Sequence, residues 1–241
     1  MAMSRHAQLL LRSAFAALAL VILGVFAFGV AVYEGYARVS PGVAPWGMPD
    51  LSERPGWFAR LQLNSASVDG NACVQMLARG GVHHTRLADH HFADGCSFTT
   101  VVSAKTAVPL HPDLIATCSL TAGLEWYEGL VNEIALRTLK AEVVRIDHVG
   151  TYVCRNINRD PNGMRSEHAT ANAIDITAFH LSNGKTISIA RDWDKATPEG
   201  QFLHEAHDAA CGIFNVVLGP DFNEAHKTHF HLDLGWFHAC H

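Results

Sequence analysis

Histidine and aspartate side chains gather in two short stretches of this chain, and these residue types suit a metal ion. The first stretch contains His168 and Asp175, and the second is His229-Phe230-His231-Leu232-Asp233, which includes the only His-x-His of the sequence. Two imidazoles and one carboxylate leave a tetrahedral zinc ion an open position for water, as hydrolytic zinc sites require. We therefore predict a Zn2+ site with His168, Asp175 and His231 as its ligands.

The spacing of the first pair requires a turn. Seven residues of extended chain span roughly 23 Å, whereas the ligands of one ion converge to a few ångströms. The small residues at 169–173 permit a reversal between His168 and Asp175. Residues 174–179 then alternate as a strand, so that Asp175 points away from an apolar side formed by Ile174, Ile176 and Ala178.

The second stretch alternates in the same way. A period of two in residues 228–234 puts the two histidines and Asp233 on one face and the apolar side chains on the other. If the two strands are neighbours in one sheet, their polar faces meet. His229 is then placed to take a proton from a metal-bound water, Asp233 to orient a histidine, and Ser166 to hold the turn or to contact substrate.

A rival metal site lies in a predicted helix at 197–211. It would use His204 and Asp208 as ligands and Glu205 as base, although the His-Glu-x-x-His pattern needs a histidine where Asp208 stands. An ordinary polar face of an amphipathic helix explains these residues as well. The periodicity also predicts a helix over 120–140, strands over 142–149 and 186–190, and a hairpin turn over 181–185.

The motif residues resemble known families. Ser166-x-His168-x6-Asp175 followed by a late His-x-His is similar to the zinc peptidases that cut peptidoglycan stem peptides, namely the D-alanyl-D-alanine carboxypeptidases, dipeptidases and murein endopeptidases. More specifically, the chain resembles the bacterial extensin-like C-terminal family. That resemblance covers most of residues 60–241, through 152–155, 165–176, 202–211, 217–221 and 226–233.

The resemblance implies roles for two further residues. Arg155 is expected to face the substrate, where its guanidinium suits a terminal carboxylate or the oxyanion of a tetrahedral intermediate. From the sequence alone, Arg155 could equally pair with a surface carboxylate. Tyr152, in the same motif, is expected to contact substrate or to support the ligands. The chain departs from the peptidases at Ala171, where they usually have glycine, and at His229, where many have Glu or Asp but murein endopeptidases have histidine.

The N-terminal region predicts a membrane anchor. Residues 13–33 contain no charge and are long enough to cross a bilayer as a helix. The alternative is a cleaved signal peptide, but such peptides normally have a shorter apolar core and a small-residue cleavage site. We expect a single-pass inner-membrane protein with the basic residues 1–12 in the cytoplasm and the remainder in the periplasm. Residues 34–57 carry four prolines and read as a tether, and residues 58–241 read as one domain.

Six cysteines fall in the predicted exported part, and none forms a Cys-x-x-Cys pair. An even count suits three disulfides in an oxidising compartment. Our prediction is sequential pairing, which joins Cys73 to Cys96, Cys118 to Cys154, and Cys211 to Cys240. The net charge of −5 offers no basic patch for nucleic acid.

These features predict an α+β fold in which a small antiparallel sheet carries the zinc site on one face and packs helices on the other, preceded by one transmembrane helix. The function predicted first is a periplasmic zinc-dependent hydrolase, a carboxypeptidase or endopeptidase, acting on peptidoglycan stem peptides. The alternative is a non-catalytic zinc-containing domain for cell-wall binding or scaffolding, because the related Hedgehog amino-terminal domain uses such a fold for interaction. A third is a disulfide-braced domain without metal. Arg155 and His229 favour the enzyme, since a binding module needs neither.

Overall fold

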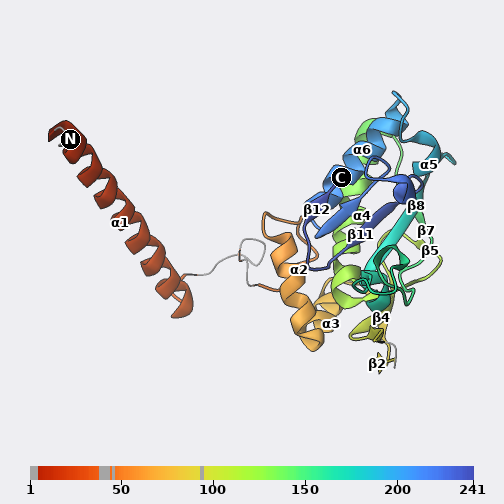
Figure 1. The fold of residues 1–241 in the computed structure, drawn as a ribbon, viewed down its shortest axis with the longest axis horizontal. Helices are drawn as coiled ribbons and strands as arrows, with labels where there is room; N and C mark the ends of the chain where they lie inside the picture. Colours follow the sequence, from red (N-terminus) through yellow and green to blue (C-terminus); the bar gives the residue numbers. More distant parts are fainter. Residues whose placement is uncertain (1–4, 38–43, 45–46, 93–94) are drawn as a thin grey trace. The chain divides into compact units, whose positions relative to one another are not determined.

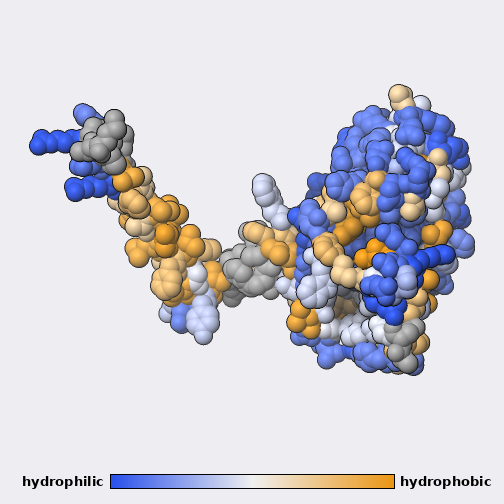
Figure 2. All heavy atoms as spheres, viewed as in Figure 1, coloured by the Kyte–Doolittle hydropathy of each residue, from blue (hydrophilic) through white to orange (hydrophobic). Residues whose placement is uncertain are grey.

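The computed structural model describes residues 5–37, 44, 47–92 and 95–241. The chain forms two compact units, Met1–Ser40 and Pro41–His241. The first unit contains α1 (Arg5–Tyr33), whose segment Leu11–Tyr33 has a mean hydropathy of 2.7. Figure 2 shows hydrophobic residues along this helix. The segment is long and apolar enough to cross a membrane, and a signal sequence has the same properties.

The second unit is built around a mixed sheet. In the described part of the chain this sheet has seven strands in the order β12-β10-β11-β8-β7-β5, with β9 also paired to β8. Its pairs are antiparallel except β5 with β7 and β10 with β12. The strands are β5 (Leu110–His111), β7 (Val143–His148), β8 (Ala173–Leu181), β9 (Thr186–Ser188), β10 (Val216–Leu218), β11 (Phe230–Asp233) and β12 (Ala239–Cys240).

Helices pack against one face of this sheet, as Figure 1 shows for α4 (Cys118–Leu139) and α6 (Pro198–Cys211). Phe179 of β8 meets Phe202 of α6 with ring centroids 5.2 Å apart, so this face is the core side. The remaining helices are α2 (Ala59–Val68), α3 (Gly70–Arg79), α5 (Ile189–Asp192) and the 3-10 turns η1 (Ile157–Arg159), η2 (Glu167–Thr170) and η3 (Glu224–His226).

Two smaller sheets complete the unit. They are formed by β1 (His83–Arg86), β4 (Val101–Lys105) and β6 (Leu114–Thr117), and by β2 (His90–His91) with β3 (Ser97–Phe98). The predicted α+β class is therefore confirmed. The helices predicted over 120–140 and 197–211 appear as α4 and α6, while the strand predicted over 186–190 ends at Ser188 because α5 begins at Ile189.

The compact unit begins earlier than the domain boundary predicted at residue 58. The buried side chain of Gln62 donates from Nε2 to the carbonyl of Ala44 at 2.9 Å. The indole of Trp126 donates to the carbonyl of Glu53 at the same distance. These bonds fasten part of the predicted tether, residues 34–57, onto the helices of the domain.

The disulfides follow the fold rather than the order of the cysteines. Cys211 pairs with Cys240, as predicted. The other two predicted pairings are wrong, because Cys73 pairs with Cys118 and Cys96 pairs with Cys154. The first joins α3 to the start of α4, two helices that pack together, and the second joins the residue just before β3 to the segment before η1.

Glu128 is a buried carboxyl group in α4. Its Oε2 accepts a hydrogen bond from Val108 N at 2.8 Å, and among the described residues its Oε1 has no partner. Burial raises the pKa of Glu128 to about 8, from an ordinary value of 4.5. Between these values the folded protein binds more protons than the unfolded chain, so the free energy of unfolding falls as the pH rises through this range.

Replacing Glu128 with glutamine is expected to remove much of this pH dependence. Glutamine keeps an acceptor for Val108 N and carries no charge, so above pH 8 the variant should be more stable by about 5 kcal/mol. Urea unfolding of residues 41–241 across this pH range, followed by near-ultraviolet circular dichroism, measures the difference. Glu133→Gln is the control, because that carboxylate is 51% exposed beside Arg54. An unchanged pH profile in Glu128→Gln would contradict the assignment.

Candidate metal centre

Two neighbouring strands carry the polar residues of the candidate site. β8 and β11 pair antiparallel in a register that sets His231 opposite Asp175, Leu232 opposite Ile174 and Phe230 opposite Ile176. Paired residues point to the same side of a sheet. The apolar pairs are fully buried on the core side, so His231 and Asp175 project together from the opposite face.

A tight turn returns the chain from His168 to Asp175. The Ser166 side chain accepts a hydrogen bond from His168 N at 3.4 Å and caps η2, so it holds the turn. Ala171 ends η2 in the left-handed region with φ of 56°, a conformation that glycine adopts at lower cost. Asn172 stabilises the turn through a hydrogen bond from its Nδ2 to Glu167 Oε2 at 2.7 Å.

Three ligand atoms converge where these elements meet. Asp175 Oδ1 lies 3.2 Å from His168 Nε2 and 2.9 Å from His231 Nδ1, and the two nitrogens are 3.3 Å apart. A ligand atom from each of these residues lies within 4.8 Å of the other two. We call His168, Asp175 and His231 the ligand trio. The trio joins the turn before β8 to β8 and β11, two strands that come from different regions of the chain and lie side by side in Figure 1.

The outer nitrogens of both histidines are held by acceptors. His168 Nδ1 lies 3.2 Å from the carbonyl oxygen of Thr151, and His231 Nε2 lies 2.9 Å from Asp233 Oδ2. A carbonyl or carboxylate can only accept, so each outer nitrogen carries the hydrogen. When the inner nitrogens are deprotonated, their lone pairs point at a shared position, which is the tautomer pattern of metal-bound histidines. The residues present fit a zinc ion.

The charges of the trio suit a cation. Burial works to raise the pKa of Asp175, but hydrogen bonds with His168 and His231 outweigh it and hold this pKa well below its usual range. Burial works to lower the pKa of His231, but hydrogen bonds to Asp175 and Asp233 outweigh it and raise this pKa to about 9. A permanent carboxylate therefore lies at the centre of a largely buried polar cluster, where positive charge stabilises it.

Two more histidines stand beside the trio. His229 Nε2 is 3.6 Å from Asp175 Oδ1, yet His229 does not belong to the group of mutually close ligand atoms. The His226 ring lies 5.3 Å from that of His229 and 6.0 Å from that of His231. From the sequence, His226 is expected only in a loop at the rim of the cleft, and it is not among the predicted ligands or catalytic residues, although the spacing His226-x-x-His229-x-His231 was a signal for a place at the site.

Arg155 approaches the same side of the site. Burial is the main reason that the pKa values of His226 and His229 are lowered, and the charge of Arg155 contributes to both. Its backbone carbonyl accepts from Ser166 N at 3.1 Å, which ties the arginine to the turn. Among the described residues Arg155 takes part in none of the ion pairs, so the alternative of a surface salt bridge finds no support.

Tyr152 packs into an aromatic cluster next to the site. Its ring lies 4.5 Å from that of Phe98 and 6.2 Å from that of Phe92. The Cys96–Cys154 disulfide fastens this cluster to the chain segment that carries Arg155. Tyr152 therefore supports the segment around Arg155, and no hydrogen bond joins it to the trio within the described residues.

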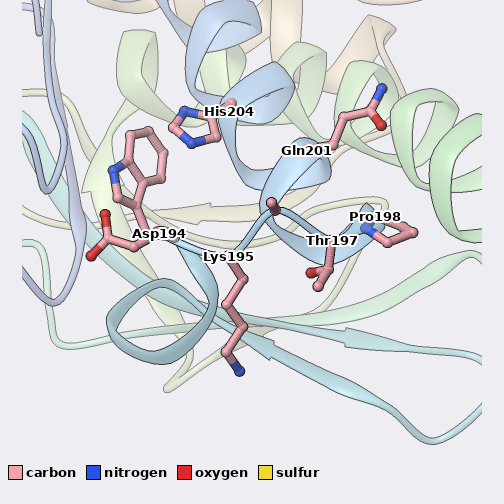
Figure 3. Close-up of a pocket in the computed structure, with 8 residues that line it drawn as sticks. Asp194, Lys195, Thr197, Pro198, Gln201 and His204 are labelled. Atoms are coloured by element: carbon pink, nitrogen blue, oxygen red, sulfur yellow. The ribbon is translucent and has the colours of Figure 1, made fainter.

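The rival site on α6 does not assemble. Glu205 forms an ion pair with Arg137, Asp208 is 81% exposed, and the His204 ring packs at a tilt against Trp193 with ring centroids 3.9 Å apart. Figure 3 shows His204 at a pocket with Lys195, Thr197 and Gln201, none of which belongs to the trio. A second grouping of possible ligands, His207 with Cys211 and Cys240, has its sulfurs in a disulfide.

Comparison with known proteins gives one result. The model of the family described as extensin-like protein C-terminus matches residues 71–241. No curated protein and no solved structure matches the chain. The matched stretch contains the ligand trio, His226, His229 and Arg155. Because it also covers more than half of the sequence, the chain belongs to the extensin-like protein C-terminus family.

Proposed function

We propose that this protein is a zinc-dependent hydrolase of peptidoglycan stem peptides. The observation that carries the proposal is the convergence of His168 Nε2, Asp175 Oδ1 and His231 Nδ1, with the outer nitrogens of both histidines already hydrogen-bonded. Three protein ligands leave one position for water or substrate. Bound zinc would acidify a water molecule and polarise a peptide carbonyl.

The chain's own residues supply the remaining chemistry. His229 presents Nε2 toward the trio while its Nδ1 lies 3.3 Å from Thr228 Oγ1, so the Nδ1–H can donate to this hydroxyl and leave a lone pair on Nε2 to accept a proton. We assign to it the removal of a proton from the attacking water and the delivery of that proton to the leaving amine. Arg155 binds either the terminal carboxylate of a stem peptide or the developing oxyanion.

The substrate class rests on resemblance and on location. Ser166-x-His168-x6-Asp175 and the late His-x-His are the residues that resemble the stem-peptide zinc peptidases. The three disulfides suit an oxidising compartment, and the basic residues ahead of α1 suit a cytoplasmic N-terminus. We place the domain in the periplasm, held by α1 in the inner membrane, where peptidoglycan is within reach.

Digestion of purified stem peptides and intact sacculi by the full chain tests this function. Zinc-loaded protein should release amino acids or peptides that mass spectrometry identifies, and a chelator should stop the release until zinc is restored. Release of a terminal residue would indicate a carboxypeptidase, and opening of a cross-link would indicate an endopeptidase. Stoichiometric zinc without cleavage of either substrate would overturn the hydrolase.

A second function has one observation in its favour. His229 Nε2 is only 3.6 Å from Asp175 Oδ1, which is near enough for a small movement to make it a fourth ligand. Four protein ligands close a zinc site and make it structural. The protein would then be a cell-wall binding or scaffolding module. Cobalt substitution separates the two functions, because the visible spectrum of cobalt responds to water or histidine in the fourth position.

Asp233→Asn is expected to weaken zinc binding by about 10–100-fold, because the carboxylate that orients His231 and increases its basicity is lost. Asparagine keeps an oxygen that can accept from Gly235 N, so the local loop should be preserved. Competition with a chromogenic chelator measures the affinity. Asp208→Asn is the matched control, since its carboxylate is 81% exposed and lies outside the trio. Equal affinities for the two variants would rule out this role.

A further inference from the structure

Two tryptophans of the domain are fully exposed. The relative exposure is 101% for Trp57 and 97% for Trp236, whereas Trp126 and Trp193 are both 5% exposed. Phe237, next to Trp236, is 60% exposed. Large aromatic side chains bury most of their surface in folded proteins, so adjacent exposed ones indicate a contact with something outside the chain.

These aromatic residues belong to one surface. Leu61 and Val68 lie on the same side of α2 and are 51% and 88% exposed, and Trp57 lies in the turn that leads into this helix. The loop after β11, which carries Trp236 and Phe237, lies against this helix (Figure 1). We call the surface formed by these five residues the apolar face.

A shared hydrogen-bond partner holds the two parts of the apolar face together. Asn215 Nδ2 donates to Asn64 Oδ1 at 3.0 Å and to the carbonyl of Gly235 at 2.7 Å. Asn64 lies on α2 between Leu61 and Val68, and Gly235 immediately precedes Trp236. The position of the loop beside the helix is therefore fixed by the fold.

The chain from the candidate membrane span enters the domain at the same helix. The span ends at Tyr33, and Ala44 is bonded through its carbonyl to Gln62 of α2. The ten residues between them, 34–43, can reach at most about 35 Å. If α1 stays in the bilayer, this short connection keeps α2 at a high effective concentration near the lipid surface, so a modest apolar patch suffices for docking.

We propose that the apolar face docks the domain on the bilayer that holds α1, with Trp57, Trp236 and Phe237 in the interfacial region. Indole rings favour this depth because they are amphipathic, with an apolar body and one polar N–H group. Docking would fix the orientation of the domain relative to the membrane. This inference rests on α1 being an uncleaved anchor and is independent of zinc and of hydrolysis.

Fluorescence quenching by brominated phosphatidylcholine tests the docking on the full chain reconstituted in vesicles. Trp46, which lies outside the described residues, is replaced by phenylalanine in every variant. The fluorescence of Trp236 is obtained by subtracting the spectrum of the Trp236→Phe variant. It should be about half as intense in vesicles of brominated lipid as in vesicles of ordinary lipid. A variant that also has Trp57→Phe keeps only Trp126 and Trp193, and these buried rings should show no quenching. Leu61→Glu should reduce the quenching of Trp236.

Other outcomes overturn the proposal. If an aqueous quencher reaches Trp236 fully while brominated lipid has no effect, the apolar face points to solvent. If neither quencher reaches it, a second copy or another protein covers the face. Loss of residues 1–33 from the mature chain, detected by its intact mass, would remove the anchor on which docking depends. Near-ultraviolet circular dichroism of each variant checks that the fold is kept.

Discussion

His168→Ala is expected to abolish stoichiometric zinc binding and, with it, hydrolysis of stem peptides. His168 is 2% exposed, and its Nε2 lies 3.2 Å from Asp175 Oδ1 and 3.3 Å from His231 Nδ1. Its loss leaves Asp175 and His231, and two ligands do not hold zinc in a protein site of this kind. Metal analysis of the purified chain measures the occupancy, and peptide release measures the activity.

The matched control is His180→Ala. His180 lies on β8 like Asp175, and its Nε2 bonds to Asp147 Oδ2 at 2.6 Å, but it is not in the ligand trio. This variant should keep its zinc. Stability gives a second readout, because zinc at a hundredfold excess over its Kd should stabilise wild type and His180→Ala by about 2.7 kcal/mol and His168→Ala by nothing. Zinc retained by His168→Ala, or lost from His180→Ala, would refute the assigned ligands.

The strands that carry the trio were predictable because apolar and polar residues alternate along them, which leaves few ways to assign the residues to the two faces of the sheet. In β8 and β11 the apolar residues fill one side completely, so a shift by one residue would bury Asp175 and His231 in the core. The turn was predictable from distance alone, since His168 and Asp175 cannot converge along one extended strand. The structure adds why Ala171 is an unusual residue there, because it occupies a left-handed conformation that glycine would favour.

Other features depend on contacts between distant segments. The pairing of Cys73 with Cys118 follows from the packing of α3 on α4, and sequence order carries no information about it. The strands β1 to β6 are five residues or shorter, and the sequence analysis assigned no element to them because such lengths give little periodicity. The sequence places His226 only in a loop at the rim of the cleft, because its position beside His229 depends on how η3 folds back before β11.

His229→Gln is expected to keep zinc and to lower kcat/KM by about 10²–10⁴-fold, the usual loss when a general acid–base group is removed. Glutamine is polar and similar in length, so the partly buried position just before β11 should fold as before. His204→Gln is the matched control for the change in residue type. The His204 ring packs against Trp193 away from the trio, so this variant should leave kcat/KM unchanged. Metal analysis and steady-state peptide release are measured on the same preparations.

The combination of zinc content and rate decides between the proposed functions. If His229→Gln retains zinc and loses its rate, His229 is the proton carrier and the site has an open position. If the substitution also removes zinc, His229 is itself a fourth ligand, and its Nε2, 3.6 Å from Asp175 Oδ1, moves closer when the metal binds. A zinc site with four protein ligands has no open position and favours the binding module. If zinc and rate both survive, the proton carrier is another group, and His226→Gln should then show the loss expected of His229, because His226 is the next imidazole beside the trio.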